Sequence, residues 1–144
     1  MSYWDSSALA KLFIMETDSD AYRVRAAAGF PLLSARLARY ELATTFRRKE
    51  AEGLLQPGGA KVLRQRFDRF VARGRIILQP DVPSLRAKFD QVLEDCLSTT
   101  PPVFVRTNDA LHIATALAAG ETDFVSADIR QKKAAETCGL TVHP

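Results

Sequence analysis

Four acidic residues are spaced along the chain so that they could act together in one reaction. Asp5 and Asp128 each follow a short apolar run that predicts a strand, Glu41 lies within a predicted helix, and Asp109 precedes an alanine-rich helix. Carboxylates gathered in one place repel one another, and a divalent cation is the simplest compensation. An all-oxygen ligand set selects a hard ion, so Mg²⁺, or Mn²⁺ in its place, fits these residues best.

Each of these acids also has a simpler structural explanation. Aspartate is favoured at helix N-caps, and Asp5, Asp109 and Asp128 all precede or open a predicted helix. Glu41 follows Leu37 by four residues and should lie near the buried side of its helix, where it needs a cation, a hydrogen-bond network or a metal. A nearby arginine is a further candidate partner for Glu41. The sequence alone leaves these interpretations open.

Other reactive residue types give little support to rival chemistries. Cys96 and Cys138 have neither CxxC spacing nor a nearby histidine pair, so we expect buried apolar fillers and neither zinc nor a disulfide. His112 stands in an apolar helix one turn after Asp109, and we expect it to serve packing or a subunit contact. The segment DSSALAK after the first strand contains no glycine, which argues against a phosphate-binding loop.

Strand and helix patterns alternate along most of the chain. Strands are predicted at SYWD, FPLL, RIILQP, TDFVSA and LTVH. Helices are predicted at ALAKLF, from an N-cap at Ser34 towards Gly53, from Ala60 to Arg73 with a stop at Gly74, from a first turn that contains Pro83, over DALHIATALAAG, and over IRQKKAAETCG. This order predicts an α/β fold, a central parallel sheet with helices on both faces. Asp5 and Asp128 then fall at the carboxyl ends of strands, where ligands bind in such sheets.

Composition indicates one domain over residues 1–144. The chain is 47% hydrophobic, which is enough for a continuous core, and its net charge of +3 favours a polyanionic partner. No apolar stretch approaches the roughly 20 residues that cross a bilayer, and the N-terminus does not read as a signal peptide. We therefore expect a soluble, cytoplasmic protein with no membrane partner.

Four sequence blocks carry a resemblance to a known family. In chain order they are YWDSSALAKLF, ARYELATTF, RTNDALHIATAL and FVSADIRQKKAAETCGL. Together they resemble the PIN domain from Tyr3 to Val142, and the chain length and the DALHIATAL block are most similar to VapC toxins of type II toxin-antitoxin systems. One such block alone is weak evidence for the family, whereas four blocks in the family's order are specific evidence for it.

The resemblance implies a metal-dependent endoribonuclease that hydrolyses RNA phosphodiester bonds with Mg²⁺ or Mn²⁺. It assigns metal binding and catalysis to four acids, and Ser6 and Ser126 match supporting hydroxyl positions near the metal. The acids are Asp5, Glu41, Asp109 and Asp128. Because none of them is lost, an active enzyme is favoured over the alternative, a non-catalytic RNA- or partner-binding PIN domain.

The same resemblance implies partners: an RNA substrate, a small cognate antitoxin protein and a second copy in a homodimer. Arg106 precedes Asp109 by three residues and could contact an RNA phosphate or pair with a site acid. Further phosphate contacts are expected from basic stretches that could equally be solvated helix faces. These stretches are Arg36 and Arg39, Arg47 to Lys49, Arg64 to Arg75, and Arg130 to Lys133.

Overall fold

A parallel sheet of five strands forms the centre of the molecule. The computed structural model describes all 144 residues, and its strand order is β3-β2-β1-β4-β5. Every neighbouring pair is parallel, with β1 in the middle, so the predicted fold class is confirmed. The strands are β1 (Tyr3–Trp4), β2 (Leu32–Ala35), β3 (Ile76–Gln79), β4 (Asp123–Val125) and β5 (Thr141–His143).

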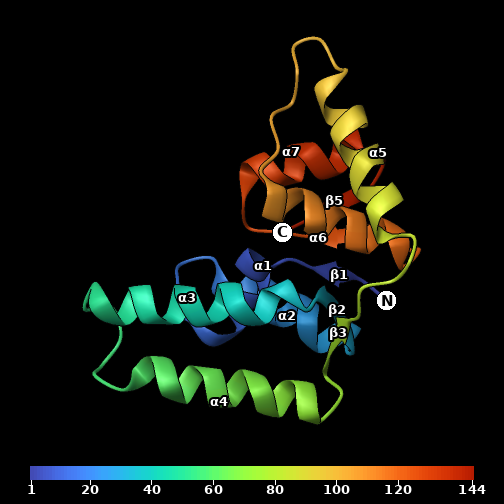
Figure 1. Ribbon diagram of the computed structural model, residues 1–144. Helices are drawn as coiled ribbons and strands as arrows, with labels where there is room; N and C mark the ends of the chain where they lie inside the picture. The colour runs from blue at the N-terminus through green and yellow to red at the C-terminus, as the bar shows by residue number, and fades with distance from the viewer.

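Two groups of helices enclose the sheet (Figure 1). One face carries α1 (Ser6–Phe13), α2 (Ser19–Gly29), α3 (Leu37–Ala51) and α4 (Gly59–Ala72). The other carries α5 (Leu85–Leu97), α6 (Thr107–Ala118) and α7 (Ile129–Thr137). None of these helices combines the length and the apolar character needed to cross a membrane.

Alternating side chains of the strands feed two separate hydrophobic cores. Trp4 and Val125 point into the core beneath α1 to α4, whereas Tyr3 and Phe124 point into the core beneath α5 to α7. This is the period of two expected for a strand buried on both faces. Tyr3 stacks on Phe124 with ring centroids 5.3 Å apart, which ties the central strand to its neighbour.

Several element boundaries differ from the sequence-based prediction. Ser34 is no helix cap: it continues β2, is fully buried, and its hydroxyl donates to the Trp4 carbonyl at 2.6 Å. Helix α2 was not predicted, although Tyr22 and Ala26, one turn apart, are both buried on its inner face. Pro83 precedes α5 instead of entering its first turn. The stop predicted at Gly74 is confirmed, with the left-handed φ of 67° that glycine tolerates after a helix.

The two cysteines are free. Cys96 is buried as predicted, Cys138 is only half-buried, and their sulfur atoms lie 3.9 Å apart. Burial raises the pKa of both thiols, that of Cys138 to about 12. The thiolate that thiol chemistry requires is therefore strongly disfavoured in both.

Arginines along α4 and after it cover aromatic side chains. The guanidinium of Arg66 lies 5.9 Å from the Phe13 ring centroid, and that of Arg75 lies 5.1 Å from the Phe30 centroid. These cation-π contacts stabilise the rim of the core. This basic stretch thus has structural partners within the chain.

Replacing Phe13 should damage the larger core. Its ring packs edge-on against Phe46, Phe67 and Phe70, with centroids 5.4 to 6.1 Å apart. We expect Phe13→Ala to lower the free energy of unfolding by about 3–5 kcal/mol, because the vacated volume cannot be refilled. Urea unfolding checks this against Val24→Ala, whose side chain is 72% exposed and which should change stability by less than about 0.5 kcal/mol. Similar losses for the two variants would contradict the packing described.

Candidate active site

A pocket of about 640 Å³ opens at the carboxyl ends of β1 and β4. Glu41, Asp109 and Asp128 line it, and they come from α3, α6 and the residue before α7. Asp5 does not line the pocket. It is fully buried just beneath, between Ser7 and Ser126.

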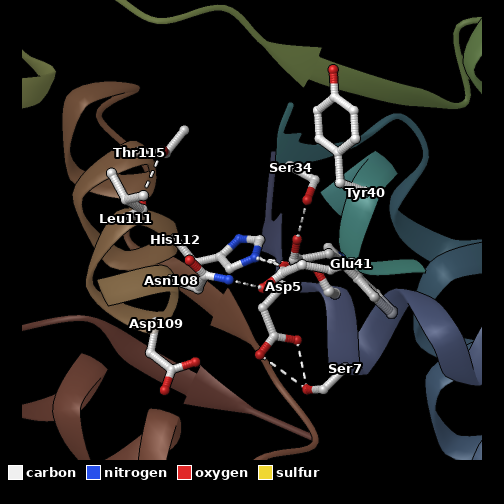
Figure 2. Close-up of polar contacts among 12 residues, drawn as sticks. Asp5, Ser7, Ser34, Tyr40, Glu41, Asn108, Asp109, Leu111, His112 and Thr115 are labelled. Atoms are coloured by element: carbon white, nitrogen blue, oxygen red, sulfur yellow. Dashed lines mark hydrogen bonds and ion pairs between the residues drawn. The ribbon is translucent and has the colours of Figure 1, made fainter. Parts of the chain in front are cut away.

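Asp5 is held by donors from two parts of the chain. Its carboxylate accepts hydrogen bonds from the Ala8 amide and the Ser7 hydroxyl, both at 2.8 Å, and from the Ser126 hydroxyl at 2.6 Å. Each serine hydroxyl in turn accepts a backbone N–H, from Ala127 at 2.8 Å for Ser7 and from Asp128 at 3.0 Å for Ser126. Figure 2 shows the Asp5 carboxylate turned towards Ser7. The start of α1 is thereby joined to the loop after β4.

Burial raises the pKa of Asp5, and the electrostatic interaction with His112 and the hydrogen bonds of Ser126, Ala8 and Ser7 partly oppose this rise. A carboxylate in such a place is stable only while its donors stay in position. Asp5 is therefore held rigidly.

The helix-capping interpretation holds for two of the three aspartates. Asp5 caps α1, and Asp128 caps α7 by accepting from the Arg130 amide at 2.8 Å. Asp109 caps nothing: α6 begins at Thr107, so Asp109 sits inside its first turn with its side chain in the pocket. Capping and a role in the site are compatible for the other two, because a cap uses one oxygen of the carboxylate.

Glu41 lies at the centre of a hydrogen-bond network, and of the alternatives considered for it this network is observed in place of an arginine partner. Its Oε2 accepts from Nε2 of His112 at 2.6 Å and from the Ser6 hydroxyl, and its Oε1 accepts from the Asn108 side chain at 3.1 Å. Figure 2 shows Asn108 and His112 reaching it from one face of α6. Burial opposes ionisation of Glu41, but the hydrogen bonds from His112, Ser6 and Asn108 outweigh it and lower the pKa.

The prediction for His112 was incomplete. The ring is buried, as expected for a packing residue, yet it donates directly to a pocket carboxylate. Its Nδ1 lies 2.7 Å from the hydroxyl of Tyr3 on β1. Ionised Glu41 can only accept, so Nε2 carries a hydrogen, and in the neutral ring Nδ1 is then the acceptor. Burial and the charge of Asp5 raise the pKa of Tyr3, so its hydroxyl keeps a proton that it can donate to Nδ1. The available signal was the spacing of Asn108 and His112 around Asp109 on one helix.

Arg106 pairs with two of the acids. Its Nε donates to Asp109 at 2.8 Å and its Nη2 to Asp128 at 3.2 Å, while its side chain remains 63% exposed. Of the two expected roles, pairing with site acids is the one observed in this structure. The guanidinium supplies the positive charge that two neighbouring carboxylates require.

The donor chemistry of the pocket fits a hard cation, although its present geometry is not a finished metal site. All the candidate ligands are carboxylates or hydroxyls, which Mg²⁺ and Mn²⁺ prefer. No three histidine, cysteine, aspartate or glutamate side chains converge on one point as a ready ligand set. Because Arg106 already neutralises Asp109 and Asp128, ion binding there requires the guanidinium to give way.

Comparison with known proteins identifies the family of the chain. The model of the PIN domain matches residues 2–137, a range that contains all four of them. The chain belongs to the PIN domain family. Ribonuclease VapC35 of Mycobacterium tuberculosis, found in two strains, is 32% identical to this PIN domain over 148 residues, which cover 99% of the chain and 95% of the relative. The resemblance inferred from the four sequence blocks is thereby confirmed.

Two polar residues of this PIN domain site were not singled out by sequence reasoning. Ser7 bonds to Asp5, whereas the predicted Ser6 bonds to Glu41, so adjacent hydroxyls serve different acids. Asn108, on which no expectation was placed, holds Glu41 from α6. Ser126, which the resemblance assigns to the supporting hydroxyls, donates its hydroxyl hydrogen to Asp5.

Removing the Tyr3 hydroxyl should leave a buried acceptor without a partner. We expect Tyr3→Phe to destabilise the PIN domain by about 1–3 kcal/mol, because Nδ1 of His112 has no other donor within reach. Tyr40→Phe is the matched control, since the exposed hydroxyl of Tyr40 makes no hydrogen bond with the chain. Unfolding by urea compares the two, and an unchanged Tyr3→Phe variant would refute the hydrogen bond to His112.

Glu41 should make the stability of the protein sensitive to acid. A carboxyl group whose pKa is lower in the folded state stabilises the fold above its unfolded value, near 4.5, and this contribution disappears as pH falls through the folded pKa. We expect Glu41→Gln to be less stable than wild type near neutral pH and to converge with it in acid. Denaturant titrations from about pH 3 to pH 7 test this. A gap that is constant with pH would show that ionised Glu41 is not stabilised by its neighbours.

Proposed function

We propose that this PIN domain, acting as one unit over residues 1–144, is a metal-dependent endoribonuclease and the toxin of a VapC-type toxin-antitoxin pair. The observation that carries the proposal is the pocket itself, where Glu41, Asp109 and Asp128 face one space from three elements. The relative named as a ribonuclease, which aligns along nearly the whole chain, supports the same activity.

In this proposal Mg²⁺ or Mn²⁺ is held by Asp5, Glu41, Asp109 and Asp128. Glu41 is prepared to do so, because its lowered pKa keeps it ionised and its orientation is fixed by His112. Asp109 is free to exchange its exposed Arg106 partner for an ion. Direct contact by Asp5 requires it to give up a serine hydrogen bond. When bound, such an ion supplies a water of lowered pKa and neutralises charge on the phosphate.

Positive side chains are placed to bind the RNA backbone around the acids. Arg48 and Lys49 on α3 line the pocket, as does Arg106, which contacts Asp109 and Asp128. We assign Arg106 to a phosphate of the RNA once it leaves the acids, since its planar guanidinium can accommodate two phosphate oxygens. Such contacts hold the backbone without reading sequence and weaken as salt increases.

The proposed partners follow from the same assignment: an RNA substrate, a small antitoxin protein and a second copy in a homodimer, with the cytoplasm as the place of action. A non-catalytic PIN domain that only binds RNA or a protein is the competing function. The pocket disfavours it, because buried and paired carboxylates are retained at a stability cost that mere binding of an anionic RNA does not require.

The decisive test is RNA cleavage by the purified protein with Mg²⁺ or Mn²⁺, with and without EDTA. We expect Asp109→Asn to reduce cleavage at least about 100-fold, as when one group stabilising the transition state is removed. It should also weaken Mn²⁺ binding measured by electron paramagnetic resonance. Its fold should persist, because the only partner of Asp109 is the exposed Arg106.

Asp90→Asn is the matched control, a change on the exposed surface of α5 outside the pocket. It should cut RNA at the wild-type rate. RNA binding without cleavage and without Mn²⁺ affinity in the wild type would instead support the non-catalytic function. Equal cleavage by Asp109→Asn and Asp90→Asn would place the activity elsewhere.

A further inference from the structure

The segment that leads from α5 into α6 holds one phenylalanine out in solvent. Val103 and Val105 pack against the core under α5 to α7, whereas Phe104 between them is 81% exposed. Because successive side chains of this segment point to opposite sides and the two valines point inward, the side chain of Phe104 points outward. It is the only exposed phenylalanine of the chain. In Figure 1 the segment descends from the top of the molecule to the start of α6, beside α7.

Phe104 forms one wall of a small hollow beside the acid pocket. The hollow has a volume of about 170 Å³, and its other walls include Val105, Arg106 and Arg130. Arg106, Asp109 and Gln131 line both this hollow and the acid pocket, so the two spaces adjoin. A ligand that lies across Asp109 therefore reaches the ring of Phe104.

The charges of the hollow suit a nucleotide. Arg130, in the first turn of α7, is exposed and forms no ion pair with any acid of the chain, so its guanidinium is available to a ligand. Only its backbone amide is used, in capping by Asp128. An open aromatic face next to an unpaired arginine is the combination with which proteins hold unpaired bases and their phosphates.

We propose that this hollow binds one nucleotide of the RNA substrate, with its base stacked on Phe104 and its phosphate paired with Arg130. The proposal rests on the ribonuclease function and adds to it a residue that places the strand relative to the acids. Stacking of this kind tolerates any base, because every base presents a π face. A base that remains paired in a duplex has no free face to offer, so the nucleotide bound here is unpaired.

A protein partner is the other occupant that an exposed phenylalanine could suit, and the two occupants make different demands. Burial in a protein interface uses the volume and apolarity of the side chain, which leucine largely preserves. Stacking uses the flat π face, which tryptophan preserves and leucine lacks. Phe104→Leu and Phe104→Trp therefore separate them.

The experiment measures binding of a fluorescent single-stranded RNA by fluorescence anisotropy, in Mg²⁺ buffer. Every protein carries Glu41→Gln to block cleavage, a residue outside the hollow. We expect Phe104→Leu to weaken binding about 10-fold, a loss within the range for one stacked base, and Phe104→Trp to retain wild-type affinity. Ile129→Ala is the control, because Ile129 is 82% exposed and adjoins Arg130 but does not line the hollow.

A scan with abasic sites tests whether the lost energy belongs to a base. One abasic position along the RNA should weaken binding to the Phe104 parent and have no further effect on Phe104→Leu. The proposal is overturned if Phe104→Leu binds the RNA as tightly as its parent. It is also overturned if every abasic position weakens binding to Phe104→Leu as much as it weakens binding to the parent. Unchanged RNA affinity with altered association in light scattering would identify the hollow as a protein contact.

Cleavage by the wild type in the same Mg²⁺ buffer separates this proposal from the function on which it rests. If the wild type cuts RNA while the Phe104 variants bind RNA as tightly as their parent, only the nucleotide site fails. If the wild type neither cuts nor binds RNA, the ribonuclease function fails and the nucleotide site fails with it.

Discussion

The buried carboxylate of Asp5 is the constraint on which the pocket depends. A charge removed from water must be surrounded by donors. Asp5 is bonded by Ser7 and Ala8 on α1 and by Ser126 directly after β4. Because Ser7 and Ser126 are themselves anchored on amides of residues 127 and 128, the loop that carries Asp128 has little freedom. The floor of the pocket is thus one connected polar network between the two central strands.

The acids around that floor are stabilised in unequal ways. Glu41 is held by His112, which is buried and is itself held by Tyr3, so its position is built into the core under α5 to α7. Asp109 and Asp128 share Arg106, whose side chain is mostly in solvent and can leave at low cost. The pocket therefore combines one fixed carboxylate with two that can exchange their partner, an arrangement suited to a ligand that arrives with its own positive charge.

Sequence reasoning succeeded where local patterns determine position. Asp5 and Asp128 follow strands of a parallel sheet, and the carboxyl ends of such strands meet at one edge. It failed where the deciding partner was remote: the Tyr3 hydroxyl that orients His112 lies 109 residues away in the sequence. The wrong prediction of a helix cap at Ser34 has a similar origin. Its hydroxyl donates to the carbonyl of Trp4 on the neighbouring strand, and that contact is not evident from the local sequence. The choice of Ser7 over Ser6 for Asp5 depended on side-chain direction, which spacing does not resolve.

The central place of β1 has a consequence for the chain during its own synthesis. β1 pairs with β2 early, but its other edge stays open until β4 has been made, and Ser126 and Asp128 follow still later. Until then Asp5 lacks one of its donors and the pocket lacks a wall. A ribosome must therefore translate the message at least as far as Asp128 before the nascent chain can form this site, and a truncated product that ends before β4 cannot form it at all.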